Sequence, residues 1–106
     1  MEIFKAFRMN DIHHGLAEYR QQTGALLLDV RTPEEYRQGH IPGSKNVPLQ
    51  TIDKWDCLTE NEDTPIYVYC HSGARSRQAV HLLNQMGHPN VTNLGGIIFY
   101  QGELAQ

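Results

Sequence analysis

Residues 66–76 read IYVYCHSGARS, a short run of β-branched and aromatic residues followed at once by a loop that contains glycine. Such residues favour strands, and the run is too short for a helix of its own, so Ile66 to Tyr69 is predicted to be a central strand. From Ala74 to Met86 the apolar residues recur at helical spacing, and Gly87 and Pro89 then end the pattern. The stretch therefore predicts a strand, a tight loop and a helix in direct succession.

The same alternation continues on both sides of this stretch. Thr32-Pro33 begins a short helix that Gly39 ends, because Thr32 can cap it and Glu35 completes a capping box. The other strands are expected at Ile3 to Phe7, Ala25 to Val30, near Asn46-Val47 and at Val91 to Leu94, and the other helices at Asp11 to Gln22, across Ile52, Trp55 and Leu58, and after a turn at Gly95-Gly96. Strands joined by helical crossovers predict an α/β fold with a mainly parallel central sheet flanked by helices on both faces.

Size and charge limit the classes of function. The 106 residues, 40% of them hydrophobic, suit a single domain over residues 1–106. The formal net charge is -3 and the nine Lys and Arg residues are scattered, which argues against a nucleic-acid partner. Met1 to Asn10 carries three charged residues and no continuous apolar stretch, so we expect neither a signal peptide nor a membrane span and predict a cytoplasmic location.

The chain has two cysteines, Cys57 and Cys70. In a reducing compartment, unpaired thiols are more common than a disulfide. Cys57 falls on an apolar helical stripe near Trp55, with no glycine-rich loop or arginine beside it, which favours a structural thiol over a second redox centre. Cys70 is the candidate for chemistry because of the loop that it begins.

The loop from Cys70 to Ser76 lies between a predicted strand end and a predicted helix start, where open α/β sheets bind their ligands. A tight turn there, made possible by Gly73, would point backbone N–H groups inward as an anion-binding nest and hold Cys70 as a thiolate. A helix N-terminus alone contributes only about 0.3 to 1 kcal/mol, whereas each hydrogen bond to a charged group contributes about 1.5 to 3 kcal/mol. We therefore expect the nest to do most of the stabilising, and Arg75 to add charge to the loop or to an anionic substrate.

This segment resembles the active-site loop of rhodanese-like domains, which runs from a catalytic cysteine to an arginine with four residues between them. Here these four are His71, Ser72, Gly73 and Ala74. Residues 29–36 (DVRTPEEY), 39–44 (GHIPGS) and 46–48 (NVP) look like the family's upstream signature, and Gly95-Gly96-Ile97 is similar to its closing glycine pair. The resemblance extends from about Ala25 to Tyr100. Tyr100, where many members have Trp, and the missing Gly-x-Pro tail are departures that concern the packing of the C-terminus.

The resemblance implies a thiosulfate sulfurtransferase with a rhodanese-like fold and no cofactor. In such an enzyme the Cys70 thiolate takes the outer sulfur of thiosulfate as a persulfide, sulfite leaves, and a thiol or cyanide acceptor removes the sulfur, with a protein persulfide as a further candidate partner. The active-site loop would consist of His71, Ser72, Gly73, Ala74, Arg75 and Ser76. Asp29 and Arg31 would support it, although Arg31 could instead pair with Glu34 or Glu35.

Three alternatives remain open. Cysteine phosphatases and related arsenate reductases also place a thiolate in an arginine-ended anion loop, but theirs has five residues between Cys and Arg, whereas this loop has four. A domain of this kind could also act as a persulfide carrier docked on a partner rather than as a free enzyme. The six histidines show no recognised ligand spacing, so no metal site is expected, and His71 either tunes the thiolate or is an ordinary loop residue facing solvent.

Overall fold

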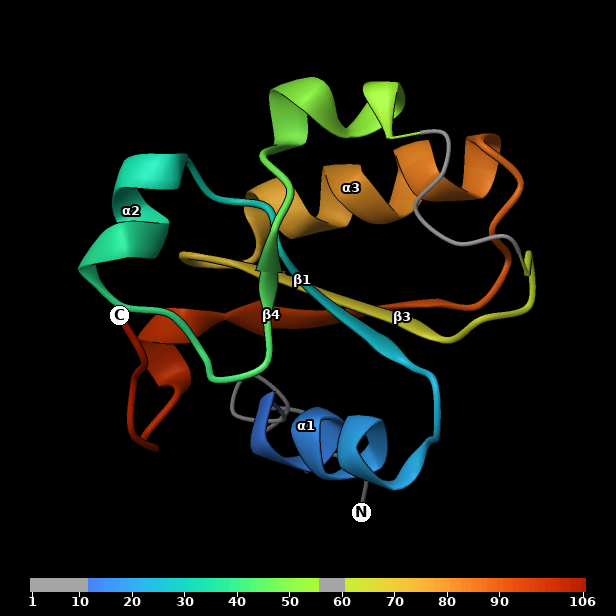
Figure 1. Ribbon diagram of the computed structural model, residues 1–106. Helices are drawn as coiled ribbons and strands as arrows, with labels where there is room; N and C mark the ends of the chain where they lie inside the picture. The colour runs from blue at the N-terminus through green and yellow to red at the C-terminus, as the bar shows by residue number, and fades with distance from the viewer. Residues whose placement is uncertain (1–11, 56–60) are drawn as a thin grey trace, which may run out of the picture.

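The computed structural model describes residues 12–55 and 61–106, in which four strands form one parallel sheet (Figure 1). The strand order is β2-β1-β3-β4, with β1 at Leu26–Asp29, β2 at Lys45–Asn46, β3 at Ile66–Cys70 and β4 at Val91–Gly96. The α-helices are α1 at Ile12–Gln21, α2 at Pro33–Gln38 and α3 at Ala74–Gln85, and two 3-10 helices are η2 at Leu49–Lys54 and η3 at Ile97–Phe99. The predicted α/β fold is confirmed. The strand expected at Ile3 to Phe7, and also Cys57 and Leu58, lie outside the described residues.

Helices cover both faces of the sheet. Neighbouring residues of a strand point to opposite faces, so Leu28 and Val68 pack under α3 and η2, whereas Leu27 and Tyr67 pack against α1. Figure 1 shows α3 on one side of the strands and α1 on the other. Helices cover both faces of β1 and β3, so β3 is buried throughout. Strands buried on both faces are apolar at nearly every position, as these two are.

The short helix α2 begins with the capping box that the sequence predicts. The backbone nitrogen of Glu35 donates to the Thr32 hydroxyl at 3.1 Å, and the backbone nitrogen of Thr32 donates to the Glu35 carboxylate at 3.0 Å. Pro33 occupies the first turn, and the chain leaves α2 at Gly39. The capping box therefore fixes the Glu35 side chain at the N-terminus of α2, just after the carboxyl end of β1.

Two predictions differ from the structure. Gly95 and Gly96 do not form a turn but belong to β4, which pairs with β3 up to Cys70 after a register shift at Val68/Tyr69. At the shift β4 has one extra residue, Leu94, whose side chain is buried against α1. Beyond Leu94 the pairing with β3 resumes at Gly95 and Gly96, although neither residue has an apolar side chain. The segment around Ile52 is helical as expected, but as a 3-10 helix of six residues.

None of the helices that the structure describes combines the length and the apolar character needed to cross a lipid bilayer.

Candidate active site

Cys70 is the last residue of β3 and lies at the carboxyl edge of the sheet. Neighbouring strands end beside it: β1 ends at Asp29, which pairs with Tyr69, and Gly96 of β4 pairs with Cys70 itself. Since all four strands are parallel, their carboxyl ends meet at one edge, and α3 starts there at Ala74. The structure thus places the predicted loop where open α/β sheets bind ligands.

The backbone of the loop is wrapped around the sulfur of Cys70. Gly73 adopts a left-handed conformation, with φ 111° and ψ -13°, which a residue with a side chain rarely takes. This turn directs two backbone nitrogens at the Cys70 Sγ: Gly73 N donates at 3.0 Å and Ser76 N at 3.3 Å. Cys70 is only 1% exposed, so the sulfur lies inside the loop, with the amides facing it.

The pKa of Cys70 results from two opposing effects. Burial raises it, because a thiolate loses hydration, and hydrogen bonds from the side chain and backbone of Ser76 and from the backbones of Gly73 and Ser72 lower it. The net pKa is below the ordinary thiol value. Each hydrogen bond to the thiolate contributes about 1.5 to 3 kcal/mol, so several together offset a desolvation penalty of several kcal/mol.

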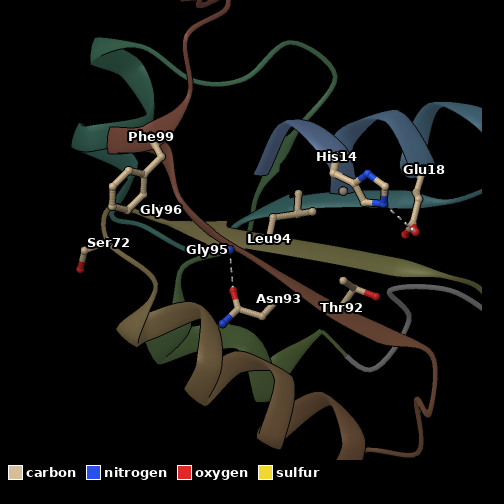
Figure 2. Close-up of a pocket in the computed structure, with 10 residues that line it drawn as sticks. His14, Glu18, Ser72, Thr92, Asn93, Leu94, Gly95, Gly96 and Phe99 are labelled. Carbon is tan, nitrogen blue, oxygen red and sulfur yellow. Dashed lines mark hydrogen bonds and ion pairs between the residues drawn. The ribbon is translucent and has the colours of Figure 1, made fainter. Parts of the chain in front are cut away.

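The hydroxyl of Ser76 connects the sulfur to β4. Its Oγ lies 3.4 Å from the Cys70 Sγ and donates to Asn93 Oδ1 at 2.7 Å. The same Asn93 oxygen accepts a hydrogen bond from Gly95 N at 2.8 Å, which Figure 2 shows as a dashed line. Sequence reasoning did not single out Asn93. Its place two residues before Gly95-Gly96, on the strand next to the cysteine, is the signal that could have identified it.

Gly96 allows β4 to pass directly under the loop. A Cβ atom at Gly96 would overlap the carbonyl oxygen of His71 and the Cα of Ser72. The backbone nitrogen of Ile98, just beyond, donates to the same His71 oxygen at 3.2 Å. The closing glycine pair of the sequence therefore has a steric role, because any side chain at position 96 would displace the loop.

Asp29 and Arg31 form a buried ion pair beside the loop. Asp29 is fully buried and Arg31 is 6% exposed, and Arg31 Nη2 donates to Asp29 Oδ2 at 2.8 Å. Arg31 Nε also donates to both carboxylate oxygens, and its Nη2 reaches the carbonyl of Gly39 at 2.7 Å. Burial opposes the charge on Arg31, but Asp29 outweighs this and raises the arginine pKa. The alternative that Arg31 pairs with Glu34 or Glu35 is therefore wrong, because Asp29 is its partner.

Arg75 binds a carboxylate rather than the loop. Its Nη1 and Nη2 donate to the two oxygens of Glu35 at 2.8 and 3.1 Å, a bidentate pair about one-third exposed. The hydrogen bond from Arg75 is the largest of the effects that lower the Glu35 pKa to about 2, and the pair raises the pKa of Arg75. Sequence reasoning considered Glu35 as a capping residue and as a possible partner of Arg31, but not of Arg75, since nothing local links it to an arginine 40 positions away.

The remaining loop residues border two hollows in the surface. His71, Ser72 and Ala74 are exposed. A groove of about 410 Å³ lies beside the loop, and its lining is His71, Arg31, Glu35, Gln38, Gly39, Ile97, Tyr100, Gly102 and Leu104. A second cavity of about 400 Å³ lies between α1 and β4 and reaches the loop at Ser72 (Figure 2). Both hollows are therefore adjacent to the loop that holds Cys70.

The described part of the chain, residues 12–55 and 61–106, contains no group of three or more His, Cys, Asp or Glu side chains placed to hold a metal ion. Within the same residues Cys70 is a free cysteine. The chemistry that this arrangement offers is that of a thiolate held by backbone amides, next to two arginines that are each paired with a carboxylate.

The chain is similar in sequence and fold to known sulfurtransferases. The profile of the family described as Rhodanese-like domain matches residues 13–99. Thiosulfate sulfurtransferase PspE of Escherichia coli (strain K12) is 37% identical over 71 residues, which are 66% of this chain and 68% of that protein. A protein of Allochromatium vinosum named Sulfurtransferase is 44% identical over 75 residues, 69% of this chain and 68% of that one. A solved structure described as rhodanese with anions from E. coli superposes with a TM-score of 0.70 at 31% identity, covering 77% of this chain and 98% of that chain.

The profile covers most of the described residues, and it includes the loop, the Asp29–Arg31 pair and both glycines of β4. Together with the two relatives, it shows that this chain belongs to the rhodanese-like sulfurtransferase family.

Proposed function

We propose that this protein moves a sulfane sulfur from thiosulfate or another donor to a thiophilic acceptor through a persulfide on Cys70. The observation that supports this most is the pair of backbone amides, Gly73 N at 3.0 Å and Ser76 N at 3.3 Å, directed at the Cys70 Sγ. Amides in this position stabilise a negative sulfur both before and after the transfer. A structural cysteine would need no such cradle.

The first step is a displacement at sulfur. The Cys70 thiolate attacks the outer sulfur of thiosulfate, a new S–S bond forms, and the S–S bond of the donor breaks, with sulfite leaving with its electron pair. The loop then holds a Cys70 persulfide, whose terminal sulfur carries the negative charge that the thiolate carried before. Because Cys70 is nearly inaccessible, the outer sulfur of the donor has to enter the loop, which puts the charged rest of the donor at its mouth.

The second step returns the enzyme to its starting state. A thiolate or cyanide attacks the terminal sulfur of the persulfide, takes it with formation of a new bond, and leaves the Cys70 thiolate behind. A two-step transfer with a covalent intermediate gives ping-pong kinetics. Arg75 and Arg31 then act as positioning residues around the loop, with Asp29 keeping Arg31 in place. A cytoplasmic location is part of this proposal, because a reducing compartment keeps Cys70 as a thiol.

The rival proposal is phosphoryl transfer in a related thiolate loop. The four residues between Cys70 and Arg75 argue against it, since the phosphatase loop that resembles this one has five and forms a wider cradle. Here Arg75 is also occupied by Glu35, whereas a phosphate group needs a free guanidinium to bind two of its oxygens.

Steady-state kinetics with thiosulfate and cyanide test the proposal, with an aryl phosphate assayed in parallel. We expect parallel lines in double-reciprocal plots, no phosphate release, and no transfer by Cys70→Ser, with Cys57→Ser as the matched control that keeps its activity. Turnover of the aryl phosphate without sulfur transfer would overturn the proposal, and so would full transfer activity in Cys70→Ser.

A further inference from the structure

The charges around the loop are matched in pairs. Arg31 is bound by Asp29 and Arg75 by Glu35, each through two or more hydrogen bonds. Among the described residues that line the groove beside the loop, Arg31 and Glu35 are the only Arg, Lys, Asp or Glu side chains, and Arg75 adjoins the groove through its ion pair with Glu35. With the buried Asp29 included, the arginines are fully neutralised, and the Cys70 thiolate leaves the site with a net negative charge.

Glu35 is held in place from two sides. The Thr32 hydroxyl and backbone nitrogen bind it through the capping box, and Arg75 binds both of its oxygens. Its pKa of about 2 keeps it charged throughout the range in which a sulfurtransferase would operate. The carboxylate therefore stays at the mouth of the groove as a permanent part of the site, rather than as a side chain that leaves when an anion arrives.

Sulfur donors differ in the charge that they carry into the groove beside the loop. Thiosulfate is a dianion, and its charge is concentrated on the group next to the outer sulfur. An organic persulfide R–S–SH carries no charge on the reacting end when protonated and a single charge when ionised. Like charges repel strongly at the short distances and reduced dielectric of a partly buried site. Because Arg31 and Arg75 are each paired with a carboxylate, they offer a dianion little attraction to offset its repulsion by the Cys70 thiolate.

We propose that Glu35, by neutralising Arg75, makes this site selective for organic persulfides over the thiosulfate dianion. This inference rests on the proposed function, because it concerns the donor of the same Cys70 persulfide. In the transfer the Cys70 thiolate attacks the terminal sulfur of R–S–SH, the Cys70–S bond forms, and the donor S–S bond breaks. R–S⁻ leaves with the electron pair, and the proton stays on the transferred sulfur.

Arg77 does not supply the missing positive charge. It is exposed on α3 and lines a different hollow, together with Gln78, His81 and Leu82. Its backbone nitrogen donates a hydrogen bond to the carbonyl oxygen of Gly73 in the first turn of α3. The selectivity therefore depends on Arg75 and on what binds it.

The decisive variant is Glu35→Gln, with Glu34→Gln as its matched control. Glutamine removes the charge but can still complete a capping box and accept a hydrogen bond from Arg75. Glu34 is the neighbouring residue in the first turn of α2, carries the same charge and is exposed. The rate of persulfide formation on Cys70 would be followed with two donors, thiosulfate and cysteine persulfide, whose amine and carboxylate charges cancel.

We expect the wild type to load from cysteine persulfide with the higher kcat/KM. Glu35→Gln should raise kcat/KM for thiosulfate about tenfold, mainly through KM, and change that for cysteine persulfide less than about twofold. Glu34→Gln should change neither. In the wild type, added salt should speed loading by thiosulfate but not by cysteine persulfide, because it screens the repulsion.

The inference is overturned if the wild type prefers thiosulfate, or if Glu35→Gln and Glu34→Gln give the same ratio of the two donors. The salt experiment needs no variant, so an equal salt response for the two donors would overturn the inference even if Glu35→Gln does not fold. Loading of Cys70 by neither donor would instead overturn the proposed function, which keeps the two failures distinguishable.

Discussion

Ser76 contacts the sulfur of Cys70 twice, with its backbone nitrogen at 3.3 Å and its Oγ at 3.4 Å. The hydroxyl has a single proton, which it donates to Asn93 Oδ1 at 2.7 Å. When Cys70 is a neutral thiol, its S–H can donate to the hydroxyl. When it is a thiolate, the hydroxyl proton is the one that can turn to the sulfur. Ser76 is therefore adapted to both protonation states of Cys70, and its effect on the thiol is measurable.

Replacing Ser76 with alanine removes the hydroxyl and leaves the backbone N–H in place. Because the Ser76 side chain lowers the pKa of Cys70, loss of this hydrogen bond raises that pKa. Less thiolate then exists at a given pH, so the pH profile of alkylation by iodoacetamide shifts to higher pH. Ser72→Ala, which alters only an exposed side chain, should leave the profile unchanged. A wild-type midpoint at the ordinary thiol value of about 8.5 would contradict this reasoning.

Glu35 makes the free energy of unfolding depend on pH in the acid range. Its pKa is lowered to about 2 in the folded protein, below the ordinary carboxyl value, so its contribution is full above about pH 4.5 and is lost as the pH falls through about 2. Glu35→Gln should therefore lower the free energy of unfolding at neutral pH by about 1 kcal/mol, after allowance for solvent screening, and by much less near pH 2. Urea unfolding at several pH values measures this, and a difference that does not change with pH would refute it.

Asp29 compensates a buried charge, so Asp29→Asn should destabilise the protein strongly. The substitution keeps the shape of the side chain but leaves Arg31, only 6% exposed, without a counter-charge. Removal of one partner of a buried ion pair costs about 3 to 5 kcal/mol. Asp53→Asn, on the exposed side of η2, is the control and should change the free energy of unfolding by less than about 0.5 kcal/mol. Similar urea midpoints for the two variants would mean that the pair contributes little.

Gly96→Ala tests the close approach of β4 to the loop. The backbone of Gly96 has φ -115°, which alanine adopts readily, so the substitution introduces a steric overlap and no backbone strain. Overlap with the His71 carbonyl oxygen and with Ser72 should displace the amides from the Cys70 sulfur, at a cost to folding of about 1 to 3 kcal/mol. We expect sulfur transfer to fall at least about tenfold while the protein stays folded. Unchanged transfer would show that the loop tolerates movement.

The parts of the fold that depend on local sequence were predictable. The strand at Ile66 and the helix from Ala74 follow from apolar pattern and stop signals, and the capping box of Thr32 and Glu35 follows from three-residue spacing. The cradle around Cys70 was also expected, because glycine at position 73 permits the left-handed turn that brings the amides inward. These features need little information from distant residues.

The parts that depend on tertiary contacts were not predictable. The pairing of Arg75 with Glu35 joins residues 40 positions apart and exists only because α2 and α3 start at the same edge of the sheet. The extension of β4 to Gly96 depends on a register shift opposite Val68 and Tyr69, which leaves no pattern in the sequence of β4 itself. The contact of Asn93 with the Ser76 hydroxyl joins two elements, so only the position of Asn93 two residues before Gly95-Gly96 marks it in the sequence.

The most direct test of the central claim is intact mass spectrometry after treatment with a sulfur donor, followed by peptide mapping. Thiosulfate and cysteine persulfide would each be applied to the wild type, to Cys70→Ser and to Cys57→Ser, with and without a reductant afterwards. The account predicts one added sulfur, located on Cys70, present in Cys57→Ser, absent in Cys70→Ser and removed by the reductant. An unmodified Cys70 after both donors, or an added sulfur that remains in Cys70→Ser, would contradict it.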